Sequence, residues 1–277
     1  MDAGVQSAPF GRLLRVWRGA RGKSQLALAI DAGVSTRHLS FVETGRASPS
    51  RDMVIMLAEA LDVPLRDRNA LLEAAGFAPI YRTTALEADA MAEVRHVLDR
   101  MLEASEPNPT LVVNRRYDIL LANRAAHRLI GGLAPAWRGP GNVIELLLAP
   151  NGIRPAIVNW AEITTHVVHR VRNELSASQQ LDDADRAMLD RIVAIDGELR
   201  AATPAATRPP TLLVPMRLRH GDQRIDLFTT ITTLGTPLDI TLQELRIETL
   251  FPADEPSRRA LQAICEPAEP AAALPPA

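Results

Sequence analysis

The sequence predicts two domains of different fold class: an all-α domain of five helices, followed by an α/β domain built on an antiparallel sheet. Three observations lead to this prediction. The chain has 277 residues, which is enough for two domains that each bury a core. Apolar residues recur with a helical period over roughly the first eighty residues. Beyond about residue 105, short β-prone runs alternate with helical stretches.

Changes of composition along the chain give the expected boundaries. The predicted segments are an N-terminal tail at 1–9, the helical domain at 10–80, a linker with a connecting helix at 81–104, the α/β domain at 105–262 and a disordered tail at 263–277. The last segment is rich in proline and alanine, and such a composition buries too little apolar surface to order the chain.

Caps and chain breakers divide the first domain into its helices. The expected helix starts carry a serine N-cap or a proline: Ser24, Ser35, Ser50 and Pro64. The expected helix ends carry a glycine, which adopts the left-handed conformation readily: Gly33, Gly45 and Gly76. The second and third helices are predicted to bury the following residues: Leu26, Ala29, Ile30, Leu39 and Val42.

The α/β domain is predicted to begin with a hairpin in the run TLVVNRRYDILLAN at 110–123. Three further strands are expected within 211–220, 224–234 and 242–251. Helical periodicity predicts helices at 123–131, 142–149, 154–175 and 183–200. The segment 201–210, rich in proline, alanine and threonine, is expected to be a loop.

Positive charge is concentrated in the helical domain, although the whole chain has a formal net charge of −2. Between Phe10 and Arg51, eight basic residues face only two acidic ones, Asp31 and Glu43, which leaves 8 − 2 = +6. A phosphate backbone attracts such a local excess of positive charge. The alternative is a helical bundle with a polar face and no nucleic acid.

Residues 24–44, SQLALAIDAGVSTRHLSFVET, have the features of a helix-turn-helix. A small residue, Ala29, lies at the expected helix crossing, and Gly33 permits the turn. The outward residues of the second of these helices can reach base edges: Thr36, Arg37, Ser40 and Phe41. We therefore favour a domain that reads double-stranded DNA.

The same segment, extended through GRASPSRDMVIMLAEALDVP, resembles the xenobiotic-response-element family of phage-repressor-like DNA-binding domains. The resemblance covers residues 10–76 and implies phosphate contacts from Gln25 and Arg46. It implies base contacts from the four outward residues, with the N-cap Ser35 included among the DNA-binding candidates. It also implies a structural ion pair between Arg18 and Glu43.

The second domain resembles the MmyB-like ligand-binding domain, a PAS-like variant, over about 105–255. The segments ILLANRAA, RPAIVNWAEITTHVVHRV and TTLGTPLDITLQELRIETLFPAD carry this resemblance. In the PAS opening an asparagine starts the first helix and a glycine ends it, and Asn123 and Gly131 stand at those places. The resemblance implies a small apolar effector, such as a fatty acid or acyl derivative.

Candidate ligand contacts come from the predicted helix 154–175. His166 and Arg170 are four residues apart and share a face, where they could hold a carboxylate. Asn159 and Arg154 are further candidates. Two alternatives stay open: these side chains face solvent or pair with nearby acids, or the domain binds only a protein partner or itself.

Other function classes find no support in the sequence. No nucleophile motif, phosphate loop or metal motif appears, so we expect no enzyme, no catalytic residue, no metal and no cofactor. The absence of a signal peptide and of a long apolar run predicts a cytoplasmic, nucleoid-associated protein without membrane contact. Together these features predict a bacterial transcriptional regulator, a homodimer on a palindromic operator.

Overall fold

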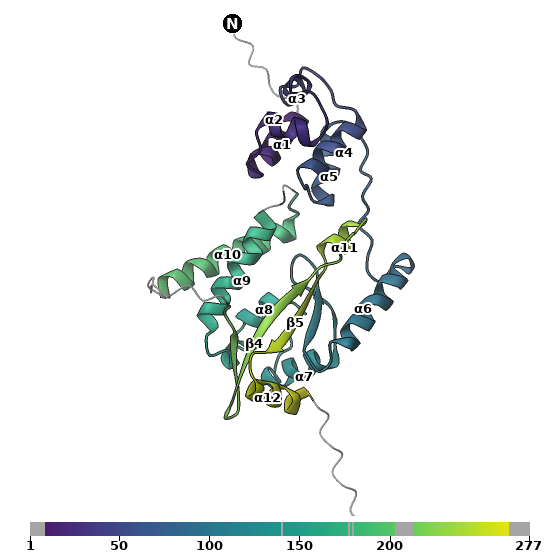
Figure 1. Cartoon of the computed structure of the whole chain (residues 1–277). Helices are drawn as coiled ribbons and strands as arrows, with labels where there is room; N and C mark the ends of the chain where they lie inside the picture. The colour runs from purple at the N-terminus through teal and green to yellow at the C-terminus, as the bar shows by residue number, and fades with distance from the viewer. Residues whose placement is uncertain (1–8, 140, 177, 179, 203–212, 266–277) are drawn as a thin grey trace, which may run out of the picture. The chain divides into compact units, whose positions relative to one another are not determined.

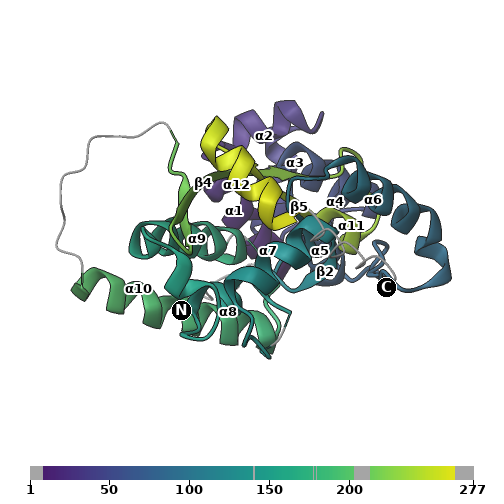
Figure 2. The same cartoon turned by 90° about the horizontal axis from the view of Figure 1, so that it is seen from below.

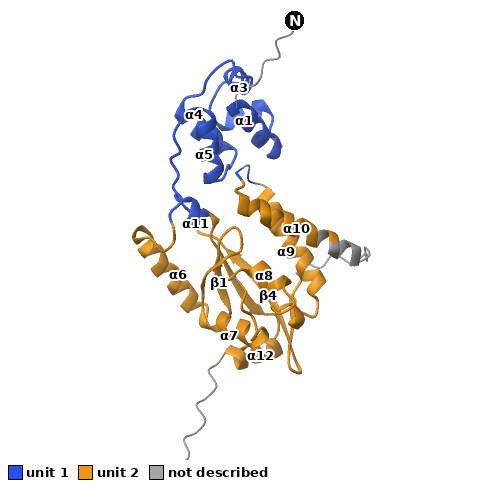
Figure 3. Ribbon diagram, turned by 180° about the vertical axis from the view of Figure 1, so that it is seen from behind, with its two compact units in different colours: residues 1–84, 178–180, 236–243 blue, residues 85–177, 181–235, 244–277 orange. Residues whose placement is uncertain are grey.

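The computed structural model describes residues 9–139, 141–176, 178, 180–202 and 213–265. The chain forms two compact units, coloured separately in Figure 3. The first unit comprises residues 1–84, 178–180 and 236–243, and the second comprises 85–177, 181–235 and 244–277. The predicted order of an all-α domain followed by an α/β domain is confirmed.

The first unit contains the five predicted helices: α1 (Pro9–Ala20), α2 (Gln25–Asp31), α3 (Thr36–Glu43), α4 (Arg51–Ala60) and α5 (Leu65–Ala74). The serine caps are confirmed, because the side chains of Ser24, Ser35 and Ser50 each accept a hydrogen bond from a backbone N–H three residues later. Gly33 and Gly76 have positive φ angles and stand at helix ends as expected.

The core of the first unit differs from the prediction on α2. Ala29 is buried as predicted, but Leu26 and Ile30 are exposed, with 59% and 70% of their surface accessible, and Leu28 is buried instead. The prediction of inward Leu26 and Ile30 was therefore wrong. In a helix this short, the apolar residues run almost all round it, so the packing of α1, α3 and α4 decides which face is buried.

The second unit is built on five strands: β1 (Thr110–Val113), β2 (Ile119–Ala122), β3 (Met216–His220), β4 (Gln223–Thr232) and β5 (Arg246–Pro252). They form one antiparallel sheet in the order β2-β1-β5-β4-β3. The central strand β5 therefore lies between the N-terminal hairpin and the C-terminal one. The predicted hairpin and the antiparallel sheet are confirmed.

Helices surround this sheet. They are α6 (Ala92–Ala104), α7 (Arg124–Leu133), α8 (Val143–Leu148), α9 (Trp160–Ser176), α10 (Asp183–Ala202) and α12 (Glu255–Cys265), with single 3-10 turns at Asp89–Met91 and Arg154–Ala156. The short helix α11 (Ile240–Glu244) precedes β5 and belongs to the first unit up to Gln243. In Figure 1, α8 and α9 lie on one side of the sheet and α6 on the other. The C-terminal helix α12 packs against α7 and β4, and Figure 2 shows it beside α7.

Several predicted boundaries in the second unit were wrong. The helix expected at 154–175 begins only at Trp160, because the backbone of Ile157 and Val158 pairs with β3 instead. The helix α7 continues through Gly131 to Leu133. The strand expected at 242–251 begins at Arg246, since the residues before it form α11.

The C-terminal tail was predicted to begin at residue 263, but α12 continues to Cys265. Residues 266–277 lie outside the described residues. The same holds for the predicted loop 201–210: its first two residues end α10, and the rest lies outside the described residues. Among the helices that the structure describes, none has the length and apolar character of a membrane span.

Candidate functional site

The helix-turn-helix consists of α2, α3 and the turn between them. Gly33 makes this turn with a φ of 64°, and the N–H of Val34 donates to the carbonyl of Ala29 at 2.9 Å. Ala29 is buried, and Val34 packs against the core. The small side chain and the left-handed glycine thus hold α3 against α2 in a fixed orientation.

The predicted DNA-reading residues lie along one side of α3. Arg37 is exposed, while Thr36, Ser40 and Phe41 are half-buried. The Arg37 guanidinium lies 5.4 Å from the centre of the Phe41 ring, so the two side chains form one continuous surface. This surface offers hydrogen-bond donors and an apolar ring edge side by side, which are the chemical features that distinguish bases in the major groove.

Glu43, the last residue of α3, is completely buried and joins α3 to Arg18 of α1. Arg18 donates to its two carboxylate oxygens at 2.7 and 3.1 Å, so the ion pair predicted from the sequence is present. Burial alone would raise the pKa of Glu43, but the hydrogen bonds from Arg18 and Gln25 and the charge of Arg15 outweigh it and lower the pKa. Glu43 therefore stays ionised as a structural group.

Gln25 belongs to this buried network. Its Nε2 atom donates to Glu43 Oε2 at 2.8 Å, so the amide that the sequence assigned to a DNA phosphate is bound to Glu43 in the free protein. Its phosphate contact stays a prediction.

The basic residues of the first unit divide into structural and exposed ones. Arg21 donates to the carbonyls of Leu61 and Asp62, and Lys23 to that of Ala60, where they satisfy the C-terminal end of α4. Five other arginines between Phe10 and Arg51 are exposed, Arg12, Arg15, Arg37, Arg46 and Arg51, and of these Arg15 donates to the carbonyl of Glu43. The charge available to a phosphate backbone is thus smaller than the sequence count, and it lies on these exposed side chains.

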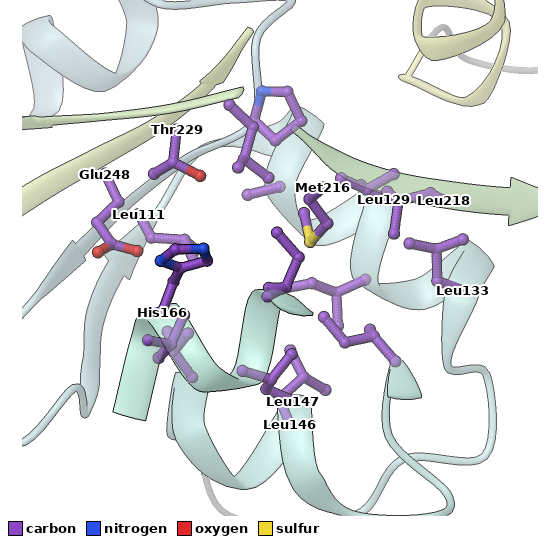
Figure 4. Close-up of a pocket in the computed structure, with 18 of the residues that line it drawn as sticks. Leu111, Leu129, Leu133, Leu146, Leu147, His166, Met216, Leu218, Thr229 and Glu248 are labelled. Carbon is purple, nitrogen blue, oxygen red and sulfur yellow. The ribbon is translucent and has the colours of Figure 1, made fainter. Parts of the chain in front are cut away.

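A pocket of about 460 Å³ lies in the second unit between the sheet and helices α7, α8 and α9. Most of its lining is aliphatic: Leu111, Leu129, Ile130, Leu133, Val143, Leu146, Leu147, Ile153, Ile163, Val167, Leu213, Val214, Met216, Leu218 and Leu250. Four polar side chains also line it: His166, Arg170, Thr229 and Glu248. Figure 4 shows Glu248, Thr229 and His166 toward one end and Leu129, Leu133 and Leu218 toward the other. The pocket has an apolar body and one polar end.

Arg170 is held at the polar end by one partner on β5 and one in the β1–β2 turn. Its Nη2 donates to Glu248 Oε1 on β5 at 2.9 Å, and its Nε donates to the Tyr117 hydroxyl at 3.0 Å. The Tyr117 hydroxyl donates in turn to Glu174 at 3.3 Å, and Glu174 lies 3.4 Å from Arg246. One alternative from the sequence was that Arg170 pairs with an acid. It does so, and the acid is Glu248 on the facing strand β5.

Burial is the largest influence on the pKa values of Glu248 and Tyr117 in this cluster. It raises the pKa of Glu248, with Glu174 adding to the effect and Arg170 and Arg246 opposing it. Burial also raises the pKa of Tyr117 to about 12, against the charge of Arg170. Tyr117 adopts a φ of 64° at the β1–β2 turn, a conformation uncommon outside glycine, and is fully buried.

The structure places two predicted ligand contacts outside the pocket lining. The side chain of Asn159 donates to Pro215 O at 2.9 Å and accepts from the N–H of Arg217, so it joins α9 to β3. The guanidinium of Arg154 stacks on Trp160 at 4.0 Å. Both residues were predicted to contact the ligand because a single helix was expected from 154 to 175. The helix begins only at Trp160, and neither residue lines the pocket.

Sequence reasoning missed Glu248, Thr229 and Tyr117. A signal for Glu248 exists in the run RIETLF, where an acid interrupts a strand that is apolar on both faces. Tyr117 carries no such signal, since its role depends on the contact with a helix 53 residues further along the chain.

Comparison with known families decides the assignment. Residues 94–264 match the model of the MmyB-like transcription regulator ligand binding domain, and residues 9–71 match a helix-turn-helix domain. The chain belongs to the MmyB-like transcription regulators. This family membership confirms the resemblance of the second domain and makes the chain a DNA-binding regulator with a ligand-binding domain.

A solved structure is similar to part of this MmyB-like regulator. The restriction-modification controller protein C.AhdI from Aeromonas hydrophila is 36% identical over 22% of this chain and 92% of its own, with a TM-score of 0.21. No curated protein matches the chain.

Proposed function

We propose that this MmyB-like regulator changes its affinity for an operator when a small, mainly apolar molecule enters the pocket of the second unit. The observation that carries the proposal is the pocket itself, with an aliphatic body, four polar side chains at its lining and a volume of about 460 Å³. A cavity of this size and composition is typical of small-molecule sites. A fatty-acid-like or acyl effector would fill the aliphatic part.

On the DNA side, we assign base recognition to the surface formed by Arg37 and Phe41, with Thr36 and Ser40 beside it. Arg37 can donate two hydrogen bonds to a guanine, and the Phe41 ring can contact a thymine methyl group. Exposed Arg46 is assigned to a phosphate. A single small module buries too little surface for tight specific binding, so we expect two copies of the chain on a palindromic operator.

Coupling between pocket and DNA is assigned to the short helix α11. Its last residue, Glu244, accepts a hydrogen bond from Arg246 at its carbonyl and lies 3.5 Å from Arg115. Arg246 in turn contacts Glu174 of the pocket cluster. The end of α11 and the cluster around Arg170 therefore share one contact residue, Arg246.

The preceding residues of α11, Ile240–Gln243, belong to the first unit. Gln243 Oε1 accepts a hydrogen bond from the N–H of Leu65 at 2.7 Å, where it caps α5 in place of the proline. The N–H of Ile240 donates to the carbonyl of Arg82 at 2.8 Å. Helix α11 is covalently continuous with β5 of the second unit and is hydrogen-bonded to α5 within the first, so a ligand that shifts β5 would act on α11 along the chain.

The experiment is a genome-wide DNA pull-down with the purified full-length protein, followed by native mass spectrometry of the same preparation. We expect enrichment of a few palindromic fragments and a co-purified molecule that organic extraction removes. Enrichment without any effect of added or removed small molecules would favour a second domain that serves only dimerisation or protein interaction.

A further inference from the structure

The polar end of the pocket already contains a counter-ion for its arginine. Glu248, buried on β5, lies 2.9 Å from Arg170, and only 9% of its side-chain surface is accessible. The acid comes from the strand that forms the floor of the pocket, so a ligand inside the pocket meets the ion pair and not a free guanidinium.

The groups around this pair balance one another in charge. Glu248 and Glu174 provide two carboxylates, and Arg170 and Arg246 provide two guanidinium groups. The Tyr117 hydroxyl between them is neutral, since its pKa is raised to about 12. His166 on α9 is the other titratable group that lines this end. With a neutral imidazole, the cluster has no net charge.

A ligand carboxylate would disturb this balance. It would place a second carboxylate next to Glu248 in a buried site where Arg170 lines the pocket and Arg246 does not, and like charges at such close range strongly disfavour double ionisation. Aspartic-protease dyads respond to the same situation by sharing a proton between the two acids. A bound acid would therefore have to arrive with a proton or transfer one to Glu248.

An uncharged polar group fits the site without this cost. Among the described residues, no hydrogen bond is found for Glu248 Oε2, Arg170 Nη1 or the Thr229 hydroxyl. These atoms offer one acceptor, one donor and one group that can do either. A head group that both donates and accepts, such as a hydroxyl or a primary amide, can use them while the Arg170–Glu248 pair stays intact.

We propose that the pocket takes amphipathic molecules whose polar end enters without net charge: alcohols, amides, or acids that take up one proton on binding. This inference rests on the proposed ligand-binding function and names the chemical class of the ligand.

The test compares three probes with the same alkyl chain, dodecanol, dodecanamide and dodecanoate, titrated into the full-length protein below their aggregation limits. At pH 8 we expect the alcohol and the amide to bind at least about tenfold more tightly than the acid. Between pH 7 and 9 the affinity for dodecanoate should fall about tenfold per pH unit, as required for uptake of one proton, and the affinity for dodecanol should stay constant.

Variants separate Glu248 from the other titrating groups. Glu248→Gln removes the competing carboxylate, so dodecanoate should bind more tightly than to the wild type and lose its pH dependence. Glu174→Gln is the matched control, because it also removes one carboxylate from the cluster but Glu174 does not line the pocket. It should tighten the binding of dodecanoate much less than Glu248→Gln does and keep the pH dependence. His166→Gln removes the imidazole and should keep the slope for dodecanoate. Circular dichroism shows whether each variant is folded.

The outcomes distinguish this inference from the function on which it rests. If dodecanoate binds the wild type as tightly as dodecanol and without pH dependence, the head-group inference is overturned while the ligand-binding function stands. The head-group inference is also overturned if Glu248→Gln leaves the preference between acid and alcohol unchanged. If none of the three probes binds the folded wild type, the proposed apolar-ligand function fails, and the head-group inference fails with it.

Discussion

Each unit of the molecule buries one arginine–glutamate pair, and the two pairs differ in how many donors the glutamate receives. Glu43 in the first unit accepts two hydrogen bonds from Arg18 and one from Gln25, and Arg15 lies 3.6 Å away. Glu248 in the second unit accepts a hydrogen bond from Arg170, and it lines the pocket at the same end as Thr229.

The pKa values of the two acids shift in opposite directions as a result. Burial raises the pKa of both carboxyls, but around Glu43 the donors outweigh it, and around Glu248 they do not. Burial alone therefore does not distinguish a structural ion pair from a ligand site. The number of hydrogen-bond donors around the buried acid distinguishes the two cases, because a carboxylate whose oxygens all accept hydrogen bonds within the protein cannot accept one from a ligand.

The largest difference between the pairs should appear in stability. Glu43→Ala leaves Arg18 without its partner in the interior, and we expect the free energy of unfolding of the full-length protein to fall by about 3–5 kcal/mol. Urea denaturation measures this. Glu59→Ala, which removes the exposed partner of Arg68, should cost under about 1 kcal/mol. Equal effects of the two substitutions would contradict a structural role for Glu43.

The tight packing around Glu43 gives the next effect. A Cβ atom on Gly11 would lie 2.4 Å from the backbone oxygen of Glu43, so Gly11→Ala should force α1 and α3 apart and cost about 1–3 kcal/mol. Gly19→Ala is the control on the same helix, where nothing lies within 4 Å of the new atom. It should stabilise the protein by up to about 1 kcal/mol. The comparison fails if thermal melting moves both midpoints in the same direction.

The exposed Arg37 should differ from the buried, paired Arg18 in affecting DNA binding and not stability. Arg37→Ala removes a side chain that stacks on Phe41 and is exposed, so stability should be unchanged while operator binding weakens by about 1–3 kcal/mol, mainly at one base pair. Fluorescence anisotropy with single-base-pair variants of the operator shows this. Arg12→Ala should leave base preference unaltered. An equal loss on specific and random DNA would make Arg37 a phosphate contact.

The smallest effect is the dependence of stability on pH. The folded pKa of Glu43 is lowered, so its contribution is present above the unfolded value near 4.3 and is lost as the pH falls through the folded value. The folded pKa of Glu248 is raised, so its contribution is present below about 4.3 and is lost as the pH rises through the folded value. The measurement is the free energy of unfolding of the wild type, Glu43→Gln and Glu248→Gln from pH 7 to 3.5. The difference between the wild type and each variant, plotted against pH, should have opposite slopes for the two variants. Parallel slopes would mean that the two environments are alike.

Local chemistry was predictable from the sequence, and the contacts that define the pocket were not. The serine caps and the glycine turns of the first unit depend on residues a few positions apart, and they were placed correctly at Ser24, Ser35, Ser50 and Gly33. The buried face of α2 depends on three other helices and was placed wrongly.

The site in the second unit shows the same limit. His166 and Arg170 line the pocket, and the sequence placed them together because helical spacing brings them to one face; their contacts with a ligand stay a prediction. Their acidic partner is 78 residues beyond Arg170 on a strand, and no local pattern pairs the two. The pairing of Ile157 with Leu218 likewise overrides the helical propensity before Trp160 and removes two of the four predicted contacts.

The most direct test of ligand control is the affinity of the full-length protein for a pulled-down operator duplex, measured with and without saturating dodecanol. We predict a change of about fivefold or more for the wild type. A much smaller change is expected for Gln243→Ala, which removes the cap that α11 supplies to α5. An unchanged operator affinity, with dodecanol shown to occupy the pocket, would contradict ligand control of DNA binding.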